Sequence, residues 1–523
     1  MTGDIELDGG PMSALGQKRT FAVQHAMSAL PPIADMCGAK RDVRLVPIAD
    51  IDQRLGNVCL VPSGHVSYFM LRLYFSRSDC HTETTAAMSG LEVSFMLGAK
   101  KAPLTFRQIM RALGPGLVTG AADDDPSGIA TYSQAGAQFG FNLLWTVFLT
   151  TPFMIAIQLV SAHIGRVTGK GIAANAKEHH HTSIVFILVS LLLAANIFNI
   201  AADIAAMGEA LYLVVGGLKH EHALIFAGGS VLLQVFVPYS RYARYLKWLT
   251  LVLLCYVGVI FTVEIPWRKV VVSTLWPTFS ISSDYLMMIV AVLGTTISPY
   301  LFFWQASQEV EEMALGHARQ PLKNLRRGGN PELERIAVDT SIGMILSNTV
   351  AFFIVLTTAV TLNAHNITDI QTAADAANAL RPIAGNFAFA LFALGIIGTG
   401  LLAIPVLAGS AAYAVAEFFG WPSTLEAKFP EARAFYIIIL AATAIGFGLG
   451  FTSFDPIKML VWSAVLNGIV SVPVMAIMMA LITSSSVMGR FRARRWLAWV
   501  GWAATALMGL VVTALILSFL IGN

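Results

Sequence analysis

The stretch GAADDDPSGIATYSQ, residues 120–134, places three consecutive carboxylates, Asp123, Asp124 and Asp125, directly before Pro126. Apolar residues precede the cluster, and the segment IATYSQAGA follows it. Proline removes a backbone donor and clashes with the preceding turn, so a helix through this run breaks at Pro126. A carboxylate at the centre of a membrane helix costs about 2.5–3.5 kcal/mol, so three together need a cation, protons or water beside them.

The rest of the chain has the composition of a membrane protein. Of its 523 residues, 56% are hydrophobic and 12% are charged, whereas soluble domains carry about 25% charged residues. Apolar runs repeatedly reach the roughly 20 residues that a helix needs to cross the hydrocarbon core. We therefore predict an all-α polytopic membrane protein with about eleven transmembrane helices. The predicted spans are 113–138, 141–164, 183–214, 221–238, 246–264, 284–314, 337–362, 386–418, 434–452, 457–483 and 496–521.

Basic residues predict the orientation of these spans. With the N-terminus inside, about 21 Lys and Arg fall in alternate loops, and about five fall in the others. The positive-inside rule then places the N-terminus in the cytoplasm and the C-terminus outside, in an inner (plasma) membrane. Because the basic residues lie in short connectors rather than on one face, the net charge of +3 does not indicate nucleic-acid binding. These features indicate the lipid bilayer as the expected partner, and the oligomeric state stays open.

Residues 1–100 differ from the rest of the chain. They mix charged residues, Pro and Gly with apolar patches too short to span. We expect a poorly structured extension or a misassigned start, followed by a transmembrane domain over residues 101–523.

A second predicted span is interrupted at a matching position. The sixth span contains GTTISPY, with Pro299 in mid-span, and five spans separate it from the break at Pro126. Spacing of this kind predicts two inverted five-helix repeats, 113–264 and 284–483, with an extra helix at 496–521. In such transporters the two broken helices face one another at the membrane midplane, around the substrate.

Asp125 is the best candidate ligand at the first break. Unwound backbone inside a membrane leaves carbonyl groups free, and the carboxylate beside Pro126 adds the charge that a cation needs. The alternative is that Asp123, Asp124 and Asp125 lie at the end of the span in headgroup water and cap the helix that starts near Ser127.

At these residues the chain resembles the natural resistance-associated macrophage protein (Nramp) family of divalent-metal transporters, over about residues 100–523. The first-span pattern of that family, GPG…DPGNxAT…QAGA, is represented by GPGLVTGAADDDPSGIATYSQAGA. Its sixth-span pattern, LGATVMPHNxYLHS, is represented by LGTTISPYLFFWQAS. The resemblance implies a leucine-transporter-like fold with helices 1 and 6 broken, and import of a divalent cation by alternating access.

The departures from the family pattern concern its metal ligands. Asp125 is kept, but the metal-binding Asn of the family is Gly128 here and its metal-binding Met is Ser298. The two sixth-span His positions are Tyr300 and Gln305. Thioether sulfur favours softer transition metals, whereas oxygen ligands favour Mg²⁺, Ca²⁺ and Mn²⁺. We therefore expect Mg²⁺ or Mn²⁺ rather than Fe²⁺, as in a branch of the family thought to carry magnesium after losing the same Met.

The resemblance implies a set of site residues. The predicted ligands are the Asp125 carboxylate, the Ser298 hydroxyl and the carbonyls near Ala122 and Thr295. Further residues are expected around these ligands or in a vestibule leading to them: Asp123, Asp124, Gly128, Tyr300 and Asn467.

Coupling to protons depends on the third span. The family pattern TDLAE is represented by ADIAA, so Asp203 matches, and Glu209 follows a few residues later. Proton symport through Asp203 and Glu209 and uncoupled, gradient-driven uptake both remain open. A structural role for the two acids, in contact with Asn196 or Asn199, is a further alternative.

Two other function classes are alternatives to the import of a divalent cation. A cation-coupled transporter of an amino acid or another organic solute would receive the substrate carboxylate at the helix N-termini after Pro126 and Pro299. The acidic cluster disfavours an anion there. A pump or membrane enzyme would need a nucleotide motif, and the sequence contains no GxxxxGK[ST]. We expect no enzyme activity and no cofactor beside the transported cation and, with symport, a proton.

Overall fold

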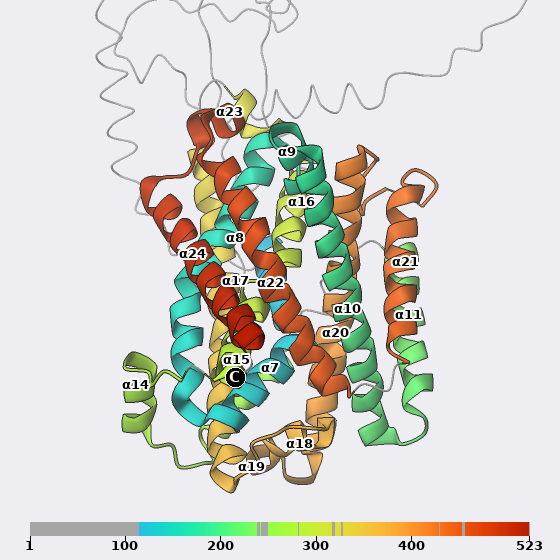
Figure 1. Ribbon diagram of the computed structural model, residues 1–523. Coiled ribbons are helices and arrows are strands. Elements are labelled where there is room, and N and C mark those ends of the chain that lie inside the picture. Colours follow the sequence, from blue (N-terminus) through green and yellow to red (C-terminus); the bar gives the residue numbers. More distant parts are fainter. Residues whose placement is uncertain are drawn as a thin grey trace, which may run out of the picture. The chain divides into compact units, whose positions relative to one another are not determined.

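The computed structural model describes residues 115–237, 241, 249–280, 282–315, 320–325, 328–427, 429–451 and 455–521. The predicted extension over residues 1–100 lies outside them. Every regular element in these ranges is a helix (Figure 1). The prediction of an all-α protein is therefore confirmed for the described residues.

The first half of the described chain begins with the broken helix. The predicted span 113–138 is two helices, α6 (Pro115–Asp123) and α7 (Pro126–Phe139). The helices that follow are η1 (Gly140–Leu143), α8 (Leu144–Thr168), α9 (Ile172–His179), α10 (Thr182–Val215), α11 (Lys219–Phe236), η2 (Leu249–Leu253), α13 (Leu254–Val259) and α14 (Trp267–Leu275).

The second half begins in the same way, with α15 (Ser283–Thr296) and α16 (Pro299–Leu315). The next long helix, α17 (Asn330–Thr361), starts before the predicted residue 337 because a proline in its first turn starts the helix ahead of the apolar run. The remaining helices are η3 (Leu322–Asn324), η4 (Asn363–His365), α18 (Ala373–Asn378), α19 (Arg381–Ala384), η5 (Gly385–Phe387), α20 (Ala388–Phe419), α21 (Arg433–Leu449), α22 (Pro456–Thr483), α23 (Ser485–Met488), η6 (Gly489–Phe491) and α24 (Arg495–Ile521).

Seven helical stretches of the described residues are long and apolar enough to cross a membrane. One of them, Pro126–Thr168, joins α7 to α8, and α21 is a shorter apolar helix of 17 residues. A helix of that length reaches about 26 Å, slightly less than the roughly 30 Å of hydrocarbon. A multi-pass membrane protein follows from these stretches, whereas the number of eleven crossings stays a prediction.

The long helices form two packed groups. We call α6, α7, α8, α15, α16 and α17 the bundle, and α10, α11, α20 and α21 the scaffold; the scaffold helices lie side by side in Figure 1. Within the bundle, α17 packs on α6 and α7, while α8 packs on α16. The second helix of each half thus packs on the broken helix of the other half, as expected for two repeats exchanged by a pseudo-twofold axis.

Glycines bring helix backbones into direct contact around the breaks. A Cβ atom added to Gly120 of α6 would lie 2.4 Å from the carbonyl oxygen of Gly343 on α17. A Cβ atom at Gly294 of α15 would lie 2.1 Å from the carbonyl oxygen of Ala464 on α22. Small residues allow this close approach in membrane helices, so α6 and α15, the first half of each broken helix, are held tightly against their neighbours.

We predict that Gly120→Ala destabilises the protein, because the neighbouring atoms are backbone and cannot turn aside. Overpacking of this kind costs about 1–3 kcal/mol. The measurement is the thermal unfolding midpoint of the purified full chain in detergent. The matched control is Gly228→Ala in α11, where no atom lies within 4 Å of the added Cβ. An unfolding midpoint for Gly120→Ala at or above that of Gly228→Ala would contradict the close contact.

Candidate functional site

The first break in the membrane-spanning helices is at Asp124 and Asp125. Helix α6 ends at Asp123, and Pro126 is the first residue of α7. Asp125 has an extended backbone, with φ −71° and ψ 170°, and its side chain caps α7. The sequence predicts a capping role for these acids only if they lie at the end of a span in headgroup water. Asp125 caps α7, but it is 1% exposed and lies inside the protein. The alternative of a span end in headgroup water therefore does not describe Asp125.

Four donors surround the Asp125 carboxylate. Its Oδ1 accepts from the Ser127 hydroxyl at 2.6 Å and from the Gly128 backbone N–H at 2.7 Å. Its Oδ2 accepts from the Asn199 amide at 3.2 Å and from the Tyr300 hydroxyl at 3.2 Å. The first two donors belong to α7 itself, whereas Asn199 lies on α10 and Tyr300 on α16. The carboxylate therefore contacts the bundle and the scaffold together.

The second break is at Ile297 and Ser298. Helix α15 ends at Thr296, and α16 starts at Pro299. The Ser298 hydroxyl lies 2.8 Å from the carbonyl oxygens of Gly294 and Thr295, so it points back to the end of its own helix. The Ile297 carbonyl accepts from Ser471 of α22 at 2.6 Å. The unwound backbone is therefore hydrogen-bonded on two sides, as burial in a membrane protein requires.

Tyr300 joins the two breaks. Its hydroxyl lies 3.2 Å from the Ala122 carbonyl oxygen as well as 3.2 Å from Asp125. Nearby, the Tyr132 hydroxyl of α7 lies 3.2 Å from the Thr296 hydroxyl of α15. The predicted ligands Asp125 and Ala122 are thus brought together at the second break, and the helix interruptions face one another.

Both helix breaks lie within a segment that matches a known family. Residues 116–518, which include both breaks, match the model of the natural resistance-associated macrophage protein-like (Nramp) family.

The chain belongs to this family.

Its relatives and structural neighbours are transporters. The divalent metal cation transporter MntH of Klebsiella pneumoniae subsp. pneumoniae is 26% identical over 426 residues, which cover 80% of this chain and 96% of the relative. A manganese transporter of Eremococcus coleocola superposes with a TM-score of 0.61 at 16% identity, over 81% of this chain and 90% of that structure. A sodium-coupled sialic acid symporter gives a TM-score of 0.50 at 12% identity, over 82% and 95% of the two chains.

These comparisons bear on two predictions. They confirm an all-helical membrane protein with the leucine-transporter-like fold that the family resemblance implied. They also place this Nramp chain in a family of transporters and not of enzymes. Since the fold is shared with a sialic acid symporter, the fold alone does not select the substrate.

Asp123 and Asp124 point to another helix of the Nramp fold. The Ser347 hydroxyl of α17 lies 2.6 Å from Asp123 Oδ2 and 2.9 Å from Asp124 Oδ1. Both residues are buried, so neither lines an open vestibule in this structure. A hydroxyl has one proton and cannot donate to both, so the other contact is completed when one carboxyl group carries a proton.

The predicted proton-route residues lie apart. Asp203 is fully buried, and neither carboxylate oxygen has a hydrogen-bond partner among the described residues. Glu209 instead pairs with Lys219, at 3.0 Å, at the start of α11. The alternative contact of Asp203 with Asn196 or Asn199 is not formed, because Asn196 donates to Leu407 and Ser410 of α20 and Asn199 donates to Asp125.

The other predicted residues lie near the breaks. The side chain of Asn467 on α22 is fully buried and has no hydrogen-bond partner within the described chain. A Cβ atom at Gly128 would lie 3.1 Å from the hydroxyl oxygen of Thr295 and 3.3 Å from the Tyr132 ring. Gly128 therefore marks a close contact between α7 and α15.

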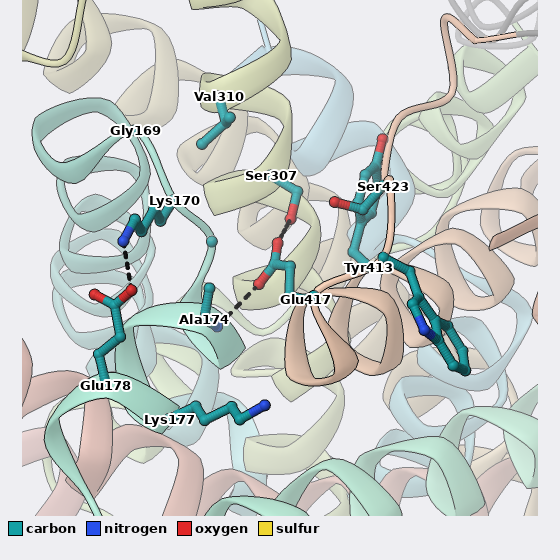
Figure 2. Close-up of a pocket in the computed structure, with 13 residues that line it drawn as sticks. Gly169, Lys170, Ala174, Lys177, Glu178, Ser307, Val310, Tyr413, Glu417 and Ser423 are labelled. Atoms are coloured by element: carbon teal, nitrogen blue, oxygen red, sulfur yellow. Dashed lines mark hydrogen bonds and ion pairs between the residues drawn. The ribbon is translucent and has the colours of Figure 1, made fainter. Parts of the chain in front are cut away.

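A pocket lies away from the breaks. It has a volume of about 560 Å³ and is bounded by the turn between α8 and α9, by α16 and by the end of α20 (Figure 2). Glu417 projects into it and accepts from Ser307 at 2.9 Å and from the backbone N–H groups of Ala173 and Ala174 at 3.2 and 3.4 Å. This carboxylate connects the N-terminus of α9 to α16 and α20.

Sequence reasoning missed three residues of the site. Asn199 is predicted only as a contact for the third-span acids, and Ser347 and Ser463 are not predicted at all. Ser463 belongs to the site because its hydroxyl donates to the Asn199 amide oxygen at 3.0 Å. The signal that could have found Asn199 is a polar side chain in the middle of an apolar span, which marks buried polar contacts in membrane proteins. Small hydroxyl residues carry no comparable signal, because they are common at helix contacts.

We predict that Ser347→Ala lowers the thermal unfolding midpoint of the purified protein. The substitution removes the hydroxyl shared by two buried carboxyl groups, and a buried group without its partner costs about 1–3 kcal/mol. The control is Thr349→Ala on the same helix, whose exposed hydroxyl bonds only its own backbone, at Ile345. Equal midpoints for the two variants would show that the Ser347 contact contributes nothing.

Proposed function

We propose that this Nramp protein imports a divalent cation across the inner membrane by alternating access, with Asp125 as the central ligand. The observation that carries the proposal is the buried Asp125 carboxylate at the meeting point of two helix breaks. A lone carboxylate in a membrane protein requires a positive partner or a proton. A divalent cation is the partner that fits a family whose relatives include divalent metal cation transporters.

The remaining ligands are neutral oxygens. We assign the carbonyls of Ala122 and Thr295 and, after rotation away from α15, the hydroxyl of Ser298. No group of three or more His, Cys, Asp or Glu side chains in the described residues is placed to hold a metal ion. A site with one carboxylate, neutral oxygens and water, and without sulfur, suits Mg²⁺ or Mn²⁺ better than a soft ion. It would resemble a branch of the family that carries magnesium.

Basic loops support a cytoplasmic N-terminus and an external C-terminus, with eleven crossings arranged as repeats 113–264 and 284–483 and a final helix at 496–521. The route of import then runs from the outer ends of α7 and α15 toward the inner ends of α6 and α16. Asp203, buried without a partner one turn beyond Asn199, supports a proton route past the site, while Glu209 is engaged with Lys219.

Transport of an organic solute by binding its carboxylate at α7 is disfavoured by one contact. The N-terminus of α7 already holds the carboxylate of Asp125, which accepts from the Gly128 N–H. A substrate carboxylate there would have to displace this cap and lie beside a second negative charge.

The direct test is uptake of Mg²⁺, Mn²⁺, Ca²⁺ and Cd²⁺ into proteoliposomes, with and without a pH gradient. We expect saturable uptake of Mg²⁺ or Mn²⁺ by the wild type and a loss of more than about tenfold for Asp125→Ala, because the only charged ligand is removed. Asp369→Ala, an exposed acid beyond α17, is the control for a general charge effect. Wild-type uptake by Asp125→Ala would refute the assignment of the site.

A second test concerns the missing sulfur. We expect Ser298→Met to raise Cd²⁺ uptake relative to Mg²⁺ uptake, because a thioether ligand favours softer metals. The quantity to measure is the ratio of initial rates for the two ions in the same vesicles, with Ser471→Met on α22 as a control for added bulk and sulfur near the second break. A preference of the wild type for Cd²⁺ over both Mg²⁺ and Mn²⁺ would contradict the oxygen-only site.

A further inference from the structure

The Asp125 carboxylate has no free lone pair in this structure. A carboxylate offers about four lone-pair positions, and the side chains of Ser127, Asn199 and Tyr300 and the N–H of Gly128 occupy them. A cation that binds Asp125 directly must therefore displace a donor.

The hydrogen-bond lengths indicate which donors a cation would displace. The bonds from Ser127 and Gly128, at 2.6 and 2.7 Å, are short and lie within the cap of α7. Those from Asn199 and Tyr300 are both 3.2 Å and come from other helices. Tyr300 can keep a hydrogen bond by donating to the Ala122 carbonyl, which is also 3.2 Å away. The position of Oδ2 is therefore where a cation enters.

Asn199 has a second arrangement with the same number of hydrogen bonds, in which its bond to Asp125 is exchanged for one to Ser463. Its Oδ1 accepts from the Ser463 hydroxyl of α22 at 3.0 Å, and that hydroxyl also lies 2.7 Å from the Leu460 carbonyl. If the amide turns over, its N–H group donates to Ser463, and Ser463 donates to Leu460. The amide oxygen of Asn199 then faces Asp125 Oδ2, where it can act as a ligand but not as a donor.

We propose that Asn199 is a ligand of the transported cation, which it binds through its amide oxygen after this turn. The inference rests on the proposed function of the Asp125 site. In the Nramp pattern the metal-binding amide belongs to an Asn at the position of Gly128. A Cβ atom at Gly128 would crowd Thr295 and Tyr132. In this proposal the amide comes from Asn199 on α10 instead. Oxygen from an amide is a ligand that Mg²⁺ and Mn²⁺ accept.

The assignment has a consequence for transport. Asp125 belongs to the bundle and Asn199 to the scaffold, so a cation held by both connects the two groups of helices. In this structure the same two residues are connected by a hydrogen bond. Binding thus replaces a hydrogen bond between the bundle and the scaffold by a cation that is bound to both.

The test is cation binding to the purified full chain, by calorimetric titration with MgCl₂ and MnCl₂, together with uptake in proteoliposomes. Asn199→Ala is expected to weaken binding about tenfold or more, since it removes an interaction with a charged group. Asn199→Asp is expected to bind within about threefold of wild type or more tightly, because it still supplies an oxygen. Asn196→Ala is the matched control: it is a buried Asn on the same helix that bonds α20 instead.

The outcomes separate a ligand from a positioning residue. If Asn199 only orients Asp125 by donating, Asn199→Asp loses as much affinity as Asn199→Ala, and the proposal is overturned. Wild-type affinity in Asn199→Ala, or an equal loss in Asn196→Ala, also overturns it. If Asn199→Ala does not fold, the comparison of Asn199→Asp with wild type decides. Failure of the proposed function is distinguishable, because the wild type itself would then bind neither ion and Asp125→Ala would change nothing.

Discussion

The structure depends on one buried interaction, the capping of α7 by the Asp125 carboxylate between two interrupted helices. A charged group here is tolerable only because four donors surround it, two from its own helix and two from α10 and α16. The ring of Pro126 breaks the helix after α6, and the Asp125 side chain beside it caps α7. The break, the cap and the candidate cation site are therefore one feature.

Close backbone packing keeps this feature in place. Gly120 on α6 and Gly294 on α15 lie against the backbones of α17 and α22, so the half-helices beside each break have little freedom to shift separately. Polar contacts also fix groups at the breaks. Ser471 donates to the Ile297 carbonyl at the second break, and Ser347 contacts the two acids at the C-terminal end of α6, Asp123 and Asp124. The position of the two breaks therefore rests on these helix contacts as well as on the Asp125 cap.

The acids of the opening motif have different roles because they point in different directions. Asp125 faces the second break and the scaffold, whereas Asp123 and Asp124 face α17 and share one hydroxyl. The donors around Asp125 come from three separate helices, α7, α10 and α16. A site assembled in this way is sensitive to any movement of the bundle against the scaffold, which is the motion that alternating access requires.

Local chemistry in the sequence determined the membrane class, the positions of both breaks and the choice of Asp125. These features depend only on residues close together in the chain, so they can be predicted without knowing the fold. The length of an apolar run predicts a membrane span, Pro126 and Pro299 predict the breaks, and the carboxylate beside a proline predicts the ligand. Only the tertiary structure decided which partners the acids have: Ser347 is 224 residues from Asp123, and Asn199 is 74 residues from Asp125. The direction of a side chain at a helix break depends on the helices packed against it, and those helices are brought together by contacts distant in the chain.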